Sequence, residues 1–209
     1  MKGFINKHVI FWDFDGVLMD SMPVRNQGFE LVLKDFPVNQ VEELMRFHLK
    51  NGGLSRYVKF RHFFENIRGE EITTKEVEKW ANRFSGIMKE NLLEPNLLIE
   101  DSLNFVKSNH DKYEMHIVSG SDQQELQYLC YELNINPYFK NICGSPTPKI
   151  ELVKTLLKEN NYNPKECLLI GDSFNDFEAA DSNEVQFFGY NNPDLKKLHT
   201  GYIESFNKL

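Results

Sequence analysis

The chain contains 209 residues, of which 41% are hydrophobic and 26% are charged, proportions that are typical of a soluble globular protein. A chain of this length forms one domain of ordinary size, or a core domain that carries a smaller insertion. The formal net charge is −7, which argues against non-specific binding to nucleic acid or to an anionic membrane, because both require a positively charged protein surface.

The N-terminal stretch MKGFINKHVIFWDFDG does not resemble a signal peptide, because its apolar run is short and soon followed by acidic residues. No segment is long enough to span a membrane. The three cysteines, Cys130, Cys143 and Cys167, are widely spaced, odd in number and without metal-ligand spacing. We interpret them as small hydrophobic residues in a reducing compartment, and we expect a cytoplasmic protein.

Residues 8–14 form the first predicted element, a short buried strand rich in Val, Ile and aromatic side chains. From residue 20 to residue 95 the chain is charged, rich in Phe and helical in period. Breaks at Pro37, Gly52-Gly53 and Gly69 separate the predicted helices of this block. These helices cover residues 24–36, 40–51, 55–67 and 74–93.

After Glu94-Pro95 helices and strands alternate. Helices are predicted over residues 97–108, 122–133, 148–159 and 174–181, and strands over 114–120, 141–143, 166–172 and 185–190. Such alternation is typical of a parallel sheet with helices on both faces. We therefore predict an α/β fold with a doubly wound parallel sheet, in which residues 1–19 and 96–209 form the core domain and residues 20–95 a helical insertion. The tail after Pro193 receives no assignment.

The first predicted strand ends in two carboxylates, Asp13 and Asp15. In an open parallel sheet, ligands bind beyond the carboxyl ends of the strands. Residues two apart on an extended chain point the same way, so both carboxylates can face one site, and Gly16 then allows a sharp turn. An Asp at the end of a strand is by itself more often a turn former than a catalytic residue, so the pair gains weight from what lies at the other strand ends.

Ser119 and Gly120 end the second predicted strand. The following helix is predicted to begin after Asp122 as its N-cap, with Glu125 three residues on, as in a capping box. A hydroxyl and free backbone N–H groups near the start of a helix suit an anion such as phosphate. A plain loop is the alternative interpretation of Ser119-Gly120.

The strand over residues 166–172 ends in Gly171-Asp172, and Asp176 follows four residues later. If Asp176 lies in the first turn of the next helix, its carboxylate can turn back toward Asp172. The alternative is a helix cap with a surface acid.

Lys149 is the basic residue that stands out in the second half of the chain. We expect Thr147 to be the N-cap of its helix and Pro148 the first helical residue. A cation at this end opposes the helix dipole, at a cost of about 0.3–1 kcal/mol. An exposed lysine tolerates that cost, whereas a lysine that faces four carboxylates and a phosphate gains far more than it loses.

Taken together, these segments resemble the four motifs of the haloacid dehalogenase (HAD) superfamily, in the order in which that family carries them. The motifs are Asp13-Phe14-Asp15-Gly16-Val17-Leu18, Ser119, Lys149 and Gly171-Asp172-Ser173-Phe174-Asn175-Asp176. The likeness covers nearly the whole chain, and the insertion over residues 20–95 resembles the helical cap domain of that superfamily. The members it most resembles are phosphoglycolate-phosphatase-like and β-phosphoglucomutase-like enzymes.

The resemblance implies a Mg²⁺-dependent phosphatase that acts through an aspartyl-phosphate intermediate. Asp13 would be the nucleophile, and Asp15 would protonate the leaving oxygen and then take a proton from the attacking water. The carboxylates of Asp13 and Asp172 and the backbone carbonyl of Asp15 would hold Mg²⁺. Ser119, the Gly120 amide and Lys149 would bind the phosphoryl oxygens, and Asp176 would orient Lys149 or a metal-bound water.

Two positions bear on the type of reaction. Dehalogenase relatives lack an aspartate two residues after the nucleophile, and phosphonatase relatives have a small residue there, so Asp15 argues against both activities. β-Phosphoglucomutase-like members carry a His five residues after the acidic residue of their Asp-Thr segment. Here that segment is Asp20-Ser21, and the corresponding residue is Arg25. This departure favours hydrolysis over phosphoryl transfer between sugar positions.

The cap offers weaker signals. The segment from Asn51 to Arg56 resembles the cap loop with which such enzymes grip sugar phosphates, which makes Gly53 and Arg56 candidates for substrate contact, although a plain interhelical turn is the alternative. Arg25 is the third candidate for substrate contact in the cap. The basic residues of the next helix either form a solvated face or contact the leaving group; they are Arg56, Lys59, Arg61 and His62. We expect the aromatic residues Phe60, Phe63, Phe64 and Trp80 to form the core of the cap.

We therefore predict a phosphatase that acts on a small phosphorylated metabolite, with a sugar phosphate as one candidate. The enzyme alternative is a sugar phosphomutase, and the non-enzyme alternative is a binding module on a HAD scaffold, against which the pair Asp13 and Asp15 speaks. We expect no nucleic-acid or membrane partner, and a monomer or small homo-oligomer.

Overall fold

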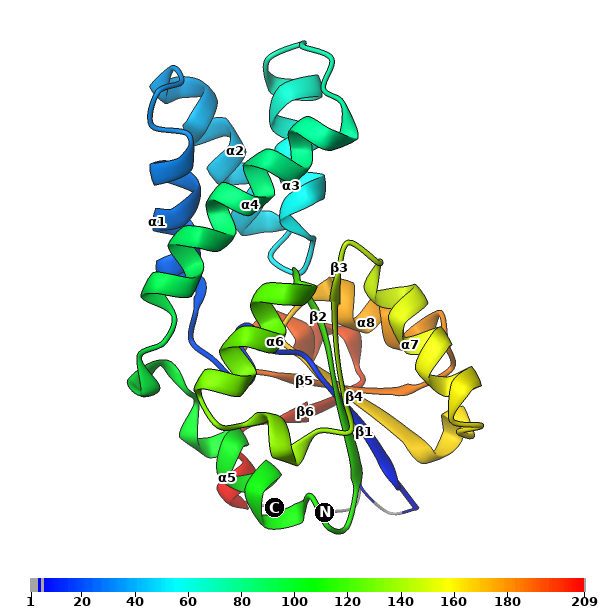
Figure 1. Ribbon diagram of the computed structural model, residues 1–209. Helices are drawn as coiled ribbons and strands as arrows, with labels where there is room; N and C mark the ends of the chain where they lie inside the picture. The colour runs from blue at the N-terminus through cyan, green and yellow to red at the C-terminus, as the bar shows by residue number, and fades with distance from the viewer. Residues whose placement is uncertain (1–3, 5, 209) are drawn as a thin grey trace.

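The computed structural model of the chain describes residue 4 and residues 6–208, so five residues of the predicted core domain, 1–3, 5 and 209, lie outside the described part. Its sheet has six parallel strands in the order β3-β2-β1-β4-β5-β6 (Figure 1). The strands are β1 (Val9–Trp12), β2 (Glu114–Asp122), β3 (Asn141–Ser145), β4 (Cys167–Gly171), β5 (Gln186–Tyr190) and β6 (Gly201–Ile203). The predicted α/β fold with a parallel sheet is confirmed.

In the described part of the chain, four α-helices follow β1 and four more alternate with the later strands. They are α1 (Met22–Val32), α2 (Val38–Lys50), α3 (Arg56–His62), α4 (Thr74–Asn91), α5 (Glu100–Asn109), α6 (Gln123–Glu132), α7 (Lys149–Glu159) and α8 (Phe174–Asp181). A π-helical turn over Phe63–Ile67 continues α3. Among the described residues, no helix is both long enough and apolar enough to cross a membrane.

The residues of β1 alternate between two hydrophobic clusters, one on each face of the sheet. Ile10 and Trp12 belong to the cluster beneath α5 and α6, whereas Val9 and Phe11 belong to the cluster beneath α7 and α8 (Figure 1). This period of two follows from the extended backbone. Because helices cover both faces, all four residues of β1 are buried and apolar.

The register of the central strands determines what lies at their carboxyl ends. Trp12 lies opposite Ile170 of β4, and the backbone N–H of Asp13 donates to the Ile170 carbonyl at 2.9 Å. Asp13 therefore leaves the sheet directly beside Gly171-Asp172. This is the edge at which open parallel sheets bind their ligands.

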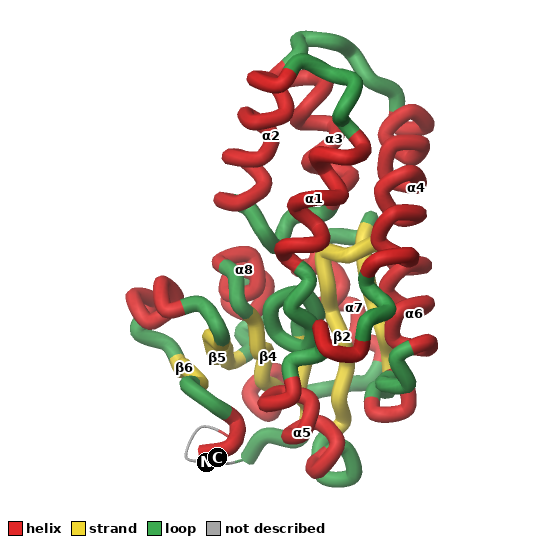
Figure 2. Tube along the Cα trace, turned by 90° about the vertical axis from the view of Figure 1, so that its left-hand side faces the viewer, coloured by secondary structure: helices red, strands yellow, loops and turns green. Residues whose placement is uncertain are grey.

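Helices α1 to α4 form the insertion, which stands beyond the sheet and its flanking helices (Figures 1 and 2). Its interior is aromatic, since the ring of Phe29 lies 4.4 Å from that of Phe84 and 5.4 Å from that of Phe60, centroid to centroid. Of the four aromatic residues expected in the cap core, Phe60, Phe63 and Phe64 are buried and Trp80 packs against them. These residues share one hydrophobic cluster with Trp12 of the sheet. The domain limits at residues 19/20 and 95/96 stay a prediction.

One local prediction differs from the structure, and the structure assigns elements to a segment that had no prediction. Helix α7 begins at Lys149, with Pro148 at the N-cap position and no side-chain cap, so the N-cap predicted at Thr147 is wrong. Pro148 is extended, with φ −59° and ψ 144°; the proline ring restricts φ but leaves ψ free to take this value. The tail without an assignment contains two 3₁₀ helices, over Pro193–Leu198 and Phe206–Lys208, and between them the sixth strand, β6.

Candidate active site

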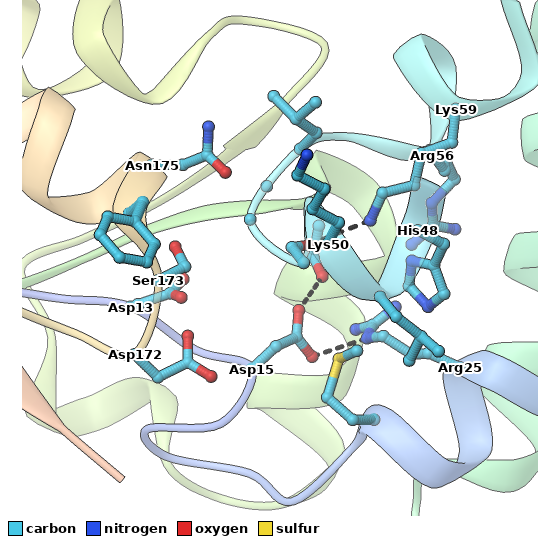
Figure 3. Close-up of a pocket in the computed structure, with 18 of the residues that line it drawn as sticks. Asp13, Asp15, Arg25, His48, Lys50, Arg56, Lys59, Asp172, Ser173 and Asn175 are labelled. Atoms are coloured by element: carbon cyan, nitrogen blue, oxygen red, sulfur yellow. Dashed lines mark hydrogen bonds and ion pairs between the residues drawn. The ribbon is translucent and has the colours of Figure 1, made fainter. Parts of the chain in front are cut away.

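A cavity of about 180 Å³ lies between the carboxyl ends of the strands and the insertion. Residues from both parts line it, among them Asp13, Asp15, Asp172, Gly53, Gly120, Arg25, His48, Arg56 and Lys59 (Figure 3). The acidic residues come from the ends of β1 and β4, and the basic ones come from the insertion. The cavity therefore has an acidic wall and a basic wall.

The acidic wall is a cluster of three carboxylates with one lysine. Asp13, Asp172 and Asp176 each offer an oxygen within 4.8 Å of the others. The Lys149 ammonium lies 2.8 Å from Asp13 Oδ1 and also donates to Asp176. Burial, followed by the Asp176 charge, raises the pKa of Asp13 to about 7, and Lys149 opposes this only in part. Burial and the Asp13 charge likewise raise the pKa of Asp172.

The start of helix α8 positions Asp176. Ser173 is the N-cap and Asp176 is the third residue of the helix, and together they form a reciprocal capping box. Asp176 Oδ2 accepts hydrogen bonds from the Ser173 N–H at 3.0 Å and from its hydroxyl at 2.6 Å, which leaves Oδ1 for Lys149. The sequence prediction that Asp176 lies in the first helical turn is therefore confirmed, and its side chain is fully buried.

Asp15 is held apart from this cluster by groups of opposite charge and by hydroxyls. Its Oδ1 accepts from Arg25 Nε at 2.6 Å and from the Ser21 hydroxyl, and its Oδ2 accepts from the Ser121 hydroxyl at 2.5 Å. Burial alone would raise the pKa of Asp15, but Arg25 and the two hydroxyls bring it below its ordinary value. Sequence reasoning missed Ser21 and Ser121, because a hydroxyl in a loop carries no signal of its own.

Gly16 allows the carboxylates to approach one another. Its φ is +76°, and a Cβ at this position would overlap the carboxylate of Asp172. Only glycine adopts that backbone without strain and leaves room for the neighbouring strand end. The sharp turn predicted after Asp15 is therefore present at Gly16, and there the loop that follows β1 packs against Asp172 at the end of β4.

On the basic wall, Glu125 joins the insertion to the sheet domain. Its side chain is fully buried and accepts from Arg56 Nη2 at 2.7 Å and from Arg25 Nη1 at 3.1 Å. Arg56 also donates to the Ser85 hydroxyl at 2.6 Å. Asp122 is the N-cap of α6, as predicted, but the expected capping-box role of Glu125 is wrong, because its carboxylate faces the arginines instead.

The basic residues of α3 divide between the two alternatives. Arg56 and Lys59 are each 3% exposed and line the cavity, so a solvated helix face is the wrong description for them. Arg61 matches that description, since it pairs with Glu65 with both side chains 40% exposed. The His62 ring stacks on Phe47 at 3.8 Å between ring centroids.

The loop before α3 packs against the sheet domain. A Cβ on Gly53 would lie 2.6 Å from Ser173 Oγ, and a Cβ on Gly120 would overlap the Gly53 carbonyl oxygen. The two glycines therefore meet where the insertion reaches the end of β2, and both line the cavity. A plain turn between helices would not require this close approach.

The residues predicted to bind phosphate occupy different positions. Gly120 lines the cavity and Lys149 lies within the carboxylate cluster. Ser119 is 1% exposed, and its hydroxyl oxygen accepts from the Ser121 N–H at 3.1 Å. Ser121, two residues further along β2, lines the cavity, as does Ser173, whereas Ser119 is not among the lining residues.

The carboxylate cluster fits a divalent cation. Three carboxylates face one ammonium, and their mutual repulsion contributes to the raised pKa of Asp13 and Asp172. A bound cation would relieve that repulsion, and oxygen ligands are those that Mg²⁺ prefers. Asp176 already accepts three hydrogen bonds, which leaves Asp13 and Asp172 as the carboxylates more open to a metal.

Curated relatives resemble the chain over most of its length. Phosphoglycolate phosphatase 1 of Pseudomonas aeruginosa is 25% identical over 216 residues, which covers 96% of this chain and 78% of the relative. The phosphorylated carbohydrates phosphatase of Thermotoga maritima is 26% identical and covers 85% of this chain and 82% of the relative. The predicted class of enzyme, a HAD-type phosphatase, agrees with these relatives.

Solved structures share the fold at lower identity. CbbY from Rhodobacter sphaeroides, in complex with phosphate, superposes with a TM-score of 0.72 at 13% identity and covers 97% of this chain and 96% of its own. The HAD-hydrolase YfnB from Bacillus subtilis, bound to magnesium, superposes with a TM-score of 0.70 at 15% identity, with the same coverage. The family model described as haloacid dehalogenase-like hydrolase matches residues 9–190 of the sequence. The chain belongs to the haloacid dehalogenase-like hydrolase family.

Proposed function

We propose that the protein is a Mg²⁺-dependent phosphatase that hydrolyses the monoester of a small phosphorylated metabolite through an aspartyl phosphate on Asp13. One observation carries this proposal: the Asp13 carboxylate is buried at the carboxyl end of β1, 2.8 Å from Lys149, in a cavity that Asp15 and Asp172 also line. A nucleophile, an acid or base, and groups that neutralise phosphate charge are thus gathered at one place.

In the first step, an oxygen of Asp13 forms a bond to phosphorus while the bond to the leaving oxygen breaks. In the second step, water displaces Asp13 from phosphorus and releases inorganic phosphate. Asp15 serves both steps, as acid toward the leaving oxygen and as base toward the water. Because Arg25, Ser21 and Ser121 favour the ionised form of Asp15, the geometry supports the second of these roles more directly than the first.

Other residues of the site bind and orient. Asp13, Asp172 and the backbone carbonyl of Asp15 would hold Mg²⁺, which when bound neutralises negative charge between the carboxylate and the phosphoryl group. Lys149, Ser119 and the Gly120 amide would bind phosphoryl oxygens. Asp176, fixed by the start of α8, would hold the Lys149 ammonium beside Asp13.

Arg25 supports hydrolysis over the mutase alternative. Its guanidinium is engaged by Asp15 on one side and Glu125 on the other, and it stands where mutase-like members carry a histidine. A sugar phosphomutase would need a bisphosphate activator and would return an isomerised sugar phosphate. Hydrolysis returns inorganic phosphate.

The test measures phosphate release from an aryl phosphate and from a panel of small phosphorylated metabolites, with Mg²⁺ and after its removal by EDTA. We expect Mg²⁺-dependent release by the wild-type protein and none by Asp13→Asn, with unchanged circular dichroism. Asp35→Asn, at an exposed aspartate of the insertion, is the matched control and should retain activity. Turnover by Asp13→Asn at the wild-type rate would exclude the covalent mechanism. Isomerised sugar phosphate without free phosphate would indicate the mutase, and inactivity on every compound would indicate a binding module.

A further inference from the structure

The basic wall holds more buried hydrogen-bonding groups than the protein satisfies. Lys59 is 3% exposed. Within the described part of the chain, its ammonium donates one hydrogen bond, to the Gly52 carbonyl at 3.0 Å. Arg25 Nη2 and His48 Nδ1 are buried and have no hydrogen-bond partner among the described residues. All three side chains line the cavity, and Figure 3 shows them together on the side opposite Asp13.

A buried lysine without a carboxylate partner is unfavourable for the folded protein. Burial, followed by the positive charge of Arg25, lowers the pKa of Lys59 to about 7. The negative charge of Asp15 raises this pKa but does not offset the two larger effects. Lysine is almost never fully buried unless it is paired, because the ammonium loses its hydration and gains too little in return. An anion from outside the chain would supply the missing partner.

The acidic residues nearby are already engaged. Asp15 accepts hydrogen bonds from Arg25, Ser21 and Ser121, and both oxygens of Glu125 accept from arginines. Neither carboxylate can turn to Lys59 without leaving another buried donor unpaired. The unpaired donors of the basic wall therefore indicate a ligand, since a rearrangement within the protein would only leave another buried donor without an acceptor.

We infer that the leaving group of the substrate carries a second anionic group, a carboxylate or a phosphate, which binds the Lys59 ammonium and the free Nη2 of Arg25. The inference rests on the proposed function, because it places the phosphoryl group at Asp13. Asp15 lies between Asp13 and the basic wall in Figure 3, where the ester oxygen would be, so the substrate would extend from the carboxylate cluster past Asp15 to Lys59.

His48 adds a neutral contact to this site. Burial, followed by the charge of Lys59, lowers the pKa of His48 to about 3, so its ring is neutral. Its Nε2 lies 2.9 Å from Asn26 Oδ1, which requires the proton on Nε2. The free Nδ1 is then an acceptor, suited to a hydroxyl of the leaving group.

The experiment compares kcat/KM for substrates that differ in the second anion. The carboxylate pair is 2-phosphoglycolate and 2-hydroxyethyl phosphate, in which a hydroxymethyl group replaces the carboxylate. The phosphate pair is fructose 1,6-bisphosphate and fructose 6-phosphate. We expect the wild-type protein to favour the charged member of at least one pair by about tenfold or more, and the pair concerned identifies the anion.

Lys59→Met removes the ammonium but keeps an apolar stem of similar length. We expect the preference for the charged member to fall by about tenfold, while thermal unfolding shifts to higher temperature because an unpaired buried charge is gone. Lys75→Met, at an exposed lysine of α4, should change neither the preference nor the activity. A lysine with a merely structural role would give a lower Tm and an unchanged preference.

The outcomes separate the two proposals. Activity without preference for the charged member of either pair overturns the second-anion site, and so does a preference that Lys59→Met retains. If Lys59→Met fails to fold, the lysine is structural and the inference is wrong. Absence of phosphate release from every compound, the aryl phosphate included, refutes the proposed phosphatase and this inference with it.

Discussion

The contact between Glu125 and the two arginines makes a stability prediction that can be worked from the structure. Glu125→Gln removes the negative charge and keeps the shape of the side chain. Arg56, 3% exposed, and Arg25, 6% exposed, would then be buried without this carboxylate. Removing one partner of a buried ion pair costs about 3–5 kcal/mol. For a chain of this size, each kcal/mol lowers Tm by about 2–4 °C, so we expect a decrease of about 6–20 °C.

The matched control is Glu65→Gln, whose partner Arg61 forms the same kind of ion pair at the surface, with both side chains 40% exposed. Exposed pairs contribute about 0–1 kcal/mol, so this variant should unfold close to the wild type. The assay is urea unfolding at pH 7.5, followed by tryptophan fluorescence, with linear extrapolation of the free energy of unfolding. Adding Arg56→Met to Glu125→Gln should cost less than the sum of the single changes, because one unpaired charge disappears.

A loss of less than about 1 kcal/mol in Glu125→Gln, similar to that of Glu65→Gln, would refute the reasoning. It would mean that the arginines find water or another acceptor when the carboxylate is removed. The ion pairs of Glu125 with Arg25 and Arg56 would then contribute little to the free energy of unfolding.

Three further predictions concern pH, charge and close packing. His116 is fully buried, and its pKa is lowered to about 4, first by burial and then by the charge of Lys140. Because His116 takes up a proton near pH 6.5 in the unfolded chain, the free energy of unfolding should fall as the pH drops below 6.5, by about 2 kcal/mol at pH 5. In urea titrations, His116→Gln should reduce this dependence of stability on pH. Lys149→Met should lower kcat at least about 100-fold with unchanged circular dichroism, and a smaller loss would contradict its place beside Asp13. Gly120→Ala should displace the Gly53 loop and reduce kcat/KM, whereas Gly86→Ala, with open space around it, should leave kinetics unchanged.

The parts of the site that were predictable lie at the ends of buried strands. Asp13 and Asp172 follow apolar runs, and a parallel sheet brings such ends to one edge whatever the insertion does. Lys149 is the first residue of α7 and Asp176 is the third residue of α8, and both helices start at this same edge of the sheet. The position of each residue at a strand end or helix start is specified by a short segment, and the parallel sheet then brings these distant segments together, which is why a pattern in the sequence can predict the cluster.

The basic wall was not predictable in the same way. Glu125 lies three residues after an N-cap, where a capping box is the ordinary expectation, and only the packing of the insertion against the sheet domain gives it Arg56 as a partner. Lys59 has the spacing of a solvated helix face, and its burial depends on the angle at which the insertion meets the sheet. The strand β6 has three residues, too few for a periodic pattern to identify it.

The hydrophobic cluster that runs without a break from Trp12 in the sheet to the Phe29 and Phe84 pair in the insertion has a consequence for cooperativity. An insertion with its own closed core could melt alone and could be exchanged between relatives as a module. Here the two parts share apolar contacts, so removing one exposes the other to water. We expect one unfolding transition in which fluorescence from Trp12 and from Trp80 changes together, and a grafted insertion that brings no matching sheet residues should leave its host with an unfilled core.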